Sequence, residues 1–284
     1  MSKFHGNENI YPKEIVLKVA DLEKSEDFYT NIMGFKILEK NKQGISLTAN
    51  GKDPIISLIS PQNPLPTKRD RTGLYHFAIL LPSSHDLGLF LKHIGRIGYP
   101  IQGGSDHGVS QAIYLEDIDK IGIEVYSDTH IDKWEREGDK INMTTLPLNN
   151  KDLIDNSGDA IWEGMPRDTI LGHIHLKVAD IKEAKRFYIE GLGMDLISEI
   201  GSSAVFTSSG GYHHHIAFNI WSGRGLDALE DNRLGMKSYS LTFPNEDILE
   251  NTIARLGELG YKVSKSDDMI FVEDPSKNLI ALKL

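Results

Sequence analysis

The chain has 284 residues, of which 39% are apolar and 25% are charged, as in a globular protein with room for two domains. Its formal net charge of −10 argues against nucleic acid or an anionic membrane as a partner, and no apolar run reaches the ~18–20 residues that span a bilayer. The absence of cysteine excludes disulfides, thiolate metal sites and cysteine nucleophiles, so any metal must be held by His, Asp or Glu.

The first part of the chain contains two units with the same order of predicted elements, namely an alternating strand, an amphipathic helix and further short strands. In the first unit, module A, the helix covers Leu22–Met33, and Gly34 is placed to end it. In the second unit, module B, a strand over Leu74–Leu81 precedes a helix over Asp86–Ile97, and the last strand covers Gly122–Tyr126.

Residues 128–169 do not follow this order. They hold Trp134 in a charged segment, a polar run around Asn149 and Asn150, and Pro166 just before the regular pattern resumes. Proline and polar clusters of this kind are typical of loops. We therefore expect a linker that contains some helix of its own.

The pattern of modules A and B returns after the linker. The segments KVADLEKSEDFYTNIMGF and KVADIKEAKRFYIEGLGM begin at Lys18 and Lys177, an offset of 159 residues, and Gly98 of module B recurs as Gly260 at an offset of 162. We therefore expect an α+β protein of four related modules, in the order A, B, A′ and B′. The first pair of modules covers residues 10–127 and the second pair covers residues 170–284.

This βαβββ order, with the two repeated segments, resembles the vicinal oxygen chelate superfamily. That superfamily includes glyoxalase I, fosfomycin-resistance enzymes, bleomycin-binding proteins and extradiol ring-cleaving dioxygenases. The resemblance implies four βαβββ modules that form two open, barrel-like sheets, with ligands pointing inward from the first and last strands of a module. Four modules in one chain look most like the extradiol dioxygenases of the bacterial catechol 2,3-dioxygenase type.

Strand periodicity separates core positions from positions that face a concavity, because successive side chains of a strand point to opposite sides. In the strand over Leu74–Leu81, Phe77 and Ile79 belong to an apolar face, and His76 lies on the other. Glu124 lies opposite the apolar positions of the last strand of module B. A histidine and a carboxylate are thus expected in the same concavity.

The same alternation selects histidines in module A′. His173 and His175 lie opposite the apolar face of the strand over Gly172–Val178, and His213 and His215 alternate with apolar residues in the segment that ends at Trp221. These four histidines are therefore predicted to face inward.

The resemblance implies a metal site at some of these positions, since the ligand positions of the superfamily fall on His76, Glu124 and His173. Two imidazoles and one carboxylate match the facial triad that binds non-haem Fe(II), with Mn(II) or another divalent metal as the alternative. The outer modules depart from this pattern. Their corresponding positions hold Glu14 in module A and Ser238 and Ala281 in module B′.

How the modules pair decides which residues can share a metal. His76 and Glu124 meet His173 only if module B pairs with A′, and A with B′. If neighbouring modules pair within each half, the candidate sets are instead Glu14 with His76 and Glu124, and His173 with His215. The sequence leaves both arrangements open.

Three further histidines are candidates for catalysis. His213 or His215 could accept a proton from a catechol or donate one to bound oxygen, because imidazole titrates near neutral pH; the alternative is a polar wall of a ligand cavity. His107, on a turn that leads into a predicted strand, could contact a substrate or a metal ligand, or be a surface histidine.

The leading functional hypothesis is therefore a metal-dependent extradiol dioxygenase that cleaves a small catechol-like aromatic with O2. A glyoxalase-type lyase or thiol transferase, and a non-catalytic small-molecule-binding protein of the same fold, are the alternatives. The N-terminus has no hydrophobic signal core, so we expect a cytoplasmic protein. Homo-oligomers are possible, because the resemblance includes proteins that pair modules across subunits.

Overall fold

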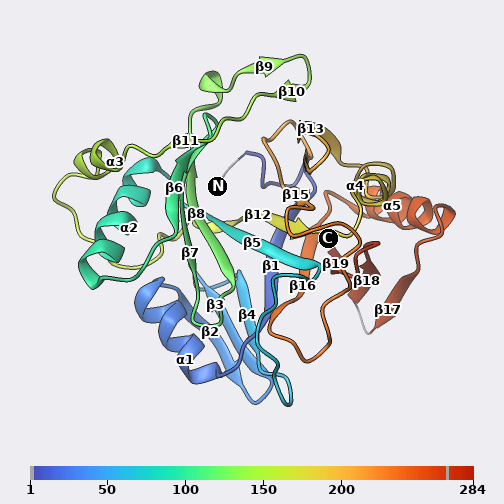
Figure 1. The fold of residues 1–284 in the computed structure, drawn as a ribbon, viewed down its shortest axis with the longest axis horizontal. Coiled ribbons are helices and arrows are strands. Elements are labelled where there is room, and N and C mark those ends of the chain that lie inside the picture. The colour runs from blue at the N-terminus through green and yellow to red at the C-terminus, as the bar shows by residue number, and fades with distance from the viewer. Residues whose placement is uncertain (1–2, 267–268) are drawn as a thin grey trace.

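The computed structural model describes residues 3–266 and 269–284, which form two large mixed sheets with helices on their outer sides (Figure 1). Each module has the predicted βαβββ order. Module A contains β1 (Tyr11–Lys18), α1 (Leu22–Asp27), the π-helical turn η1 (Phe28–Ile32), β2 (Lys36–Asn41), β3 (Gly44–Thr48) and β4 (Ile56–Ile59). Module B contains β5 (Gly73–Leu80), α2 (Ser84–Ile97), β6 (Gly103–Asp106), β7 (Ser110–Glu116) and β8 (Gly122–Asp128).

The second half repeats these elements. Module A′ contains β12 (Ile170–Lys177), α4 (Ile181–Lys185), the π-helical turn η3 (Arg186–Gly191), β13 (Asp195–Ile200), β14 (Ala204–Ser208) and β15 (Ile216–Asn219). Module B′ contains β16 (Gly235–Thr242), α5 (Glu246–Glu258), β17 (Val263–Ser266), β18 (Met269–Glu273) and β19 (Leu279–Lys283). The segment between the halves contains η2 (Ile131–Lys133), β9 (Arg136–Glu137), β10 (Lys140–Ile141), β11 (Leu146–Pro147) and α3 (Asn150–Asn156).

Each sheet combines one module from each half of the chain. The eight-stranded sheet has the order β17-β18-β19-β16-β1-β4-β3-β2, and the nine-stranded sheet has the order β11-β6-β7-β8-β5-β12-β15-β14-β13. Module A is therefore joined to B′ through antiparallel β1 and β16, and B to A′ through antiparallel β5 and β12. This is the first of the two pairings that the sequence left open. The alternative set of Glu14 with His76 and Glu124 is excluded, because Glu14 lies in the other sheet.

The predicted helix of module A differs from the observed one in its second half. The α-helix is capped by the Asp21 side chain, which accepts from the backbone N–H groups of Glu23 and Lys24, and it passes into the π-helical turn at Phe28. The wider turn places both Phe28 and Tyr29 in the core, at 1% and 0% exposure. The helix of module B was predicted more closely, and it is capped by Ser83 and ended by Gly98 in a left-handed conformation.

The two sheets share one core, in which β1 packs against β12. Ile15 and Leu17 of β1, and Ile174 and Leu176 of β12, are fully buried there. Burying each such side chain stabilises the fold by about 1.5–3 kcal/mol. None of the described helices has the length and apolar character to cross a membrane.

A buried hydrogen bond in each half also joins the two sheets. Tyr29 of module A donates to Asp117 of module B at 2.9 Å, and Tyr188 of A′ donates to Asp274 of B′ at the same distance. Asp117 also accepts from the backbone N–H groups of Asp119 and Ile121. Burial nevertheless raises the pKa of Asp117 to about 7.

Replacing Asp117 with asparagine should therefore change how stability depends on pH. The folded protein binds the Asp117 proton more tightly than the unfolded chain, so this group lowers the free energy of unfolding as the pH rises from about 4 to about 7, by up to about 1.4 kcal/mol per pH unit. The Asp117→Asn variant does not lose free energy of unfolding in this way. The difference between its free energy of unfolding and that of the wild type should therefore increase from about pH 4 to about pH 7 and then level off. Urea unfolding at pH 5 to 8 measures the difference. The exposed Asp159→Asn variant is the control, and a pH-independent difference for Asp117→Asn would contradict the raised pKa.

Candidate metal centre

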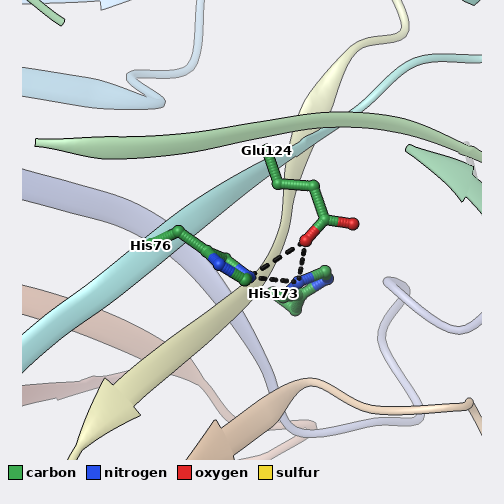
Figure 2. Close-up of side chains that lie close together, drawn as sticks. All are labelled: His76, Glu124 and His173. Atoms are coloured by element: carbon green, nitrogen blue, oxygen red, sulfur yellow. Dashed lines mark hydrogen bonds and ion pairs between the residues drawn. The ribbon is translucent and has the colours of Figure 1, made fainter. Parts of the chain in front are cut away.

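Three potential metal ligands converge on neighbouring strands of the nine-stranded sheet. His76 lies on β5, Glu124 on β8 and His173 on β12, and their side chains point toward one another (Figure 2). The Glu124 Oε2 atom lies 2.9 Å from His76 Nε2 and 3.3 Å from His173 Nε2, and the two Nε2 atoms are 3.4 Å apart. Within the described residues this is the one group of three His, Asp or Glu side chains whose ligand atoms come this close together. The structure thus brings together the set that the family resemblance implied.

The surroundings of His173 and Glu124 favour the protonation states of metal ligands. His76, Glu124 and His173 are 7%, 3% and 2% exposed, respectively. Burial lowers the pKa of His173 to about 4, so its imidazole is neutral at pH 7. Burial alone would raise the pKa of Glu124, but the adjacent His173 and His76 side chains hold that pKa well below its ordinary value. The site therefore offers a neutral imidazole at His173 and a carboxylate at Glu124, which together with the His76 imidazole form a donor set suited to a divalent cation.

A β-bulge and a glycine fix the position of His173. The pairing of β12 with β5 shifts register between Leu171 and His173, so that Gly172 is an extra residue there. A Cβ atom on Gly172 would lie 2.0 Å from the Tyr126 hydroxyl oxygen, so no larger residue fits in this conformation. The ring of Tyr126 packs beside His173, with centroids 5.0 Å apart. The glycine thus lets a tyrosine of module B support a ligand from module A′.

A cavity of about 970 Å³ opens next to this site. His76 and Glu124 line it, together with residues from both modules of the nine-stranded sheet, among them Tyr75, His107, Tyr114, His175, His214 and Trp221. Its volume lies in the range of small-molecule sites, ~300–1,000 Å³. His76 and Glu124 therefore border a cavity that is large enough for an organic substrate.

His107 lies in this cavity and is held in one orientation. Its Nδ1 atom donates to the Thr144 carbonyl at 2.7 Å, and its Nε2 atom accepts from the Tyr114 hydroxyl at 2.8 Å. Burial and the charge of Glu124 raise the pKa of Tyr114 well above its ordinary value, so its hydroxyl keeps its proton. Thr144 belongs to the segment between the halves, which thereby helps to shape the cavity.

The histidine run 213–215 is oriented differently from the prediction. His214 lines the cavity, with its ring centroid 4.1 Å from that of His173, whereas His213 and His215 are fully buried and do not line it. The predicted alternation fails because β15 begins only at Ile216, so the histidines belong to the turn before the strand. The expectation that His213 and His215 face the concavity is thus corrected in favour of His214; their catalytic role stays a prediction.

The two buried histidines make separate contacts. His213 Nε2 donates to Asp128 Oδ1 at 2.9 Å, and its Nδ1 lies 2.9 Å from His214 Nδ1. His215 donates to the Phe4 carbonyl at 3.1 Å and packs against His5, with centroids 4.8 Å apart. His213 thus connects a carboxylate to the cavity histidine, whereas His215 fastens the N-terminal segment to module A′.

Several cavity residues were missed by the sequence reasoning. Tyr114 could have been found by its place on β7, the neighbour of β8, whose Glu124 it faces in register. Tyr75 could not, because a bulge in the pairing of β5 with β12 breaks the alternation there. Trp221 lies in the turn that follows β15, two residues beyond the end of the strand.

The corresponding region of the eight-stranded sheet holds no comparable set. Glu14 Oε2 pairs with Lys283 Nζ at 3.1 Å, and Glu14 Oε1 accepts from Ser57 at 2.8 Å. Ser238 and Ala281 offer no metal ligand at the other two positions, as the sequence indicated. A lysine ammonium group here compensates the carboxylate that would otherwise be available to a metal.

Comparison with known proteins supports both the fold and the dioxygenase resemblance. The family model for the Glyoxalase/Bleomycin resistance protein/Dioxygenase superfamily matches residues 12–125 and 170–282. The chain is 41% identical over 283 residues to a Bacillus subtilis (strain 168) protein named catechol-2,3-dioxygenase, covering 97% of this chain and 96% of that protein.

Solved structures show the same fold at low sequence identity. A candidate dioxygenase from Bacillus subtilis subsp. subtilis str. 168 superposes with a TM-score of 0.67 at 14% identity, covering 98% of this chain and 86% of that one. Glyoxalase I from Zea mays superposes with a TM-score of 0.56 at 15% identity, covering 96% and 92%. With the family model matching both halves, the chain belongs to the Glyoxalase/Bleomycin resistance protein/Dioxygenase superfamily.

Proposed function

We propose that the chain is an extradiol dioxygenase that uses Fe(II) to cleave the ring of a catechol-like aromatic with O2. The observation that carries this proposal is the convergence of His76, Glu124 and His173 beside a 970 Å³ cavity. The 41% identity to a protein named catechol-2,3-dioxygenase supports the reaction class.

The residues fit a divalent metal of this kind. The ion would be held by three atoms, His76 Nε2, His173 Nε2 and Glu124 Oε2. These atoms lie 2.9 to 3.4 Å from one another, close enough to bind the same ion. Fe(II) bound by two histidines and a carboxylate keeps positions open for a catechol and O2, and supplies the electron transfer between them. Mn(II) or another divalent ion is the alternative for the same donor set.

His214 is placed to take the proton that a catechol loses on binding. Asp128 accepts from His213 Nε2, which leaves His213 Nδ1 to accept from His214 Nδ1. The ring of His214 lines the cavity, and its Nε2 lone pair is then without a hydrogen-bond partner among the described residues. Burial lowers the pKa of His214 well below its ordinary value, which keeps it neutral and able to accept. A proton taken at Nε2 would be stabilised through His213 by Asp128.

In this proposal, Tyr114 and His107 orient the substrate. The Tyr114 hydroxyl lies between His107 and the Glu124 carboxylate, on the wall of the cavity. Because His107 is fixed by Thr144, the tyrosine hydroxyl is held in one place from which it can share a hydrogen bond with a substrate oxygen. These side chains thus limit how a catechol ring can sit next to the metal ligands.

Oxygen uptake by the metal-loaded protein tests the proposal. Protein purified without a histidine tag is loaded anaerobically with Fe(II), Mn(II), Ni(II) or Zn(II), and O2 consumption and the yellow ring-cleaved product are followed with a panel of catechols. We expect one Fe(II) per chain and O2 uptake that requires both metal and catechol. Nickel- or zinc-dependent turnover of a thiol adduct without O2 would instead indicate a glyoxalase-type lyase, and the absence of bound metal would indicate a binding protein.

A further inference from the structure

The cavity continues beyond the metal ligands along β12 to Lys177. This residue ends β12 and lines the cavity, and it shares a face of the strand with His173 and His175. At about 3.3 Å per residue, its backbone lies roughly 13 Å along the strand from that of His173. The wall of the cavity thus includes the metal ligand His76, His175 and Lys177.

The ammonium group of Lys177 has no carboxylate within ion-pair distance among the residues that the structure describes. Its Nζ atom donates to the Arg69 carbonyl at 3.5 Å, and burial lowers its pKa. A partly buried ammonium group without a counter-charge is unfavourable unless a ligand supplies one.

Each of the other lysine and arginine residues that line the cavity has a carboxylate within ion-pair distance. Lys68 lies 3.5 Å from Asp70, Arg69 lies 3.4 Å from Glu116, and Lys120 lies 3.9 Å from the same glutamate. Glu199 lies 3.0 Å from Lys185. Lys177 is therefore the cavity cation whose charge is left for a ligand, in a chain that is acidic as a whole.

Two half-exposed aromatic side chains stand between the metal ligands and Lys177. Tyr75 and Trp221 are 43% and 47% exposed, and their rings lie 5.3 Å apart in an edge-to-face arrangement. Each also contacts the His175 ring, at 5.0 and 5.3 Å. The bulge in β5 brings Tyr75 to the cavity face beside His76. Such rings offer a flat, apolar wall to an aromatic ligand.

We propose that this region is an anion subsite, so that the substrate is an extended aromatic diol with a carboxylate on an arm. The diol oxygens lie at the metal ligands, the ring and arm lie along Tyr75 and Trp221, and the carboxylate pairs with Lys177. This inference rests on the proposed function and narrows its substrate class. A cavity of about 970 Å³, near the upper end of the range for ligand pockets, fits such a molecule better than unsubstituted catechol.

A matched pair of ligands tests the subsite. The probes are 3-(3,4-dihydroxyphenyl)propionate and its methyl ester, which differ in the negative charge and in one methyl group. Their dissociation constants are measured anaerobically by tryptophan fluorescence with the metal-loaded wild type, with Lys177→Met and with Lys177→Arg. The control is Lys24→Met, which removes an exposed lysine of α1 outside the cavity.

We expect the wild type to bind the acid roughly tenfold to hundredfold more tightly than the ester, the ratio for a charged hydrogen bond. Lys177→Met should lose this preference with little change in ester binding, while Lys177→Arg and Lys24→Met should keep most of it. Equal binding of acid and ester by the wild type would overturn the subsite, even if a variant failed to fold. An equal loss of acid binding in Lys177→Met and Lys24→Met would do the same.

Turnover of a neutral substrate separates this inference from the proposed function. If 4-methylcatechol is cleaved with O2 but acid and ester bind alike, the dioxygenase stands and the anion subsite fails. If the acid is preferred through Lys177 but neither diol is cleaved, the subsite stands and the dioxygenase function fails.

Discussion

Replacing His76 with alanine should remove the bound metal and lower ring cleavage by a factor on the order of 10³ or more. The variant keeps only two of the three proposed ligands, His173 and Glu124, which should bind a metal more weakly. A metal at an active site supplies several kcal/mol of transition-state stabilisation, so its loss should lower the rate. The loss should therefore appear in two independent measurements, namely the metal content after dialysis and the rate of catechol-dependent O2 uptake. Glu124→Gln should behave in the same way, because an amide oxygen is a weaker ligand than a carboxylate.

Glu14 provides a matched control for these variants. It occupies the ligand position of the first strand in module A, as His173 does in A′, but it pairs with Lys283 in the other sheet. Glu14→Gln should therefore keep the metal content and the rate of O2 uptake. Full activity in His76→Ala, or loss of metal in Glu14→Gln, would contradict the placement of the metal centre between modules B and A′.

Replacing His214 with asparagine should leave the metal in place but lower kcat by roughly 10²–10⁴, the usual contribution of a positioned acid or base. The imidazole contacts the ring of His173 and is connected to Asp128 through His213, so its loss removes the proton acceptor that the cavity offers. Anaerobic catechol binding and steady-state O2 uptake separate the two effects, since we expect binding to change far less than kcat.

Two further variants distinguish proton transfer from packing. Asp128→Asn weakens the stabilisation of a protonated His213–His214 pair without touching the cavity, and it should lower kcat by less than His214→Asn does. His85→Gln, at an exposed site at the start of α2, should change nothing. If His214→Asn kept wild-type kcat with a normal metal content, His214 would be only a wall of the cavity.

Much of the fold could be predicted from spacing alone. The offset of 159 residues between Lys18 and Lys177 reflects two copies of a strand–helix unit, and those two lysines do end β1 and β12. The π-helical turn at Phe28 could not be predicted, because hydrophobic periodicity does not distinguish a π-helical turn from a continued α-helix. The pairing of modules was also open, since strand patterns show which face is buried but not which edge strands meet.

The candidate metal ligands could be predicted because the family resemblance gave their positions and because regular apolar alternation follows His76 and His173 and flanks Glu124, although a bulge lies next to each of the two histidines. His76 and Glu124 lie well inside β5 and β8, and His173 lies inside β12. The prediction for the histidine run 213–215 was wrong because these residues precede β15. The direction of His214 depends on its neighbours, since His213 is hydrogen-bonded to Asp128 and His215 to the Phe4 carbonyl. Those partners are 85 and 211 residues away in sequence, and no local pattern reveals them.

The most direct test of a single metal centre between modules B and A′ is a crystal structure of the iron-loaded protein with diffraction recorded at the iron absorption edge. We expect one anomalous peak per chain, within bonding distance of His76 Nε2, Glu124 Oε2 and His173 Nε2, and no peak beside Glu14 in the eight-stranded sheet. Iron bound elsewhere, or no peak at these three residues in fully loaded protein, would contradict it.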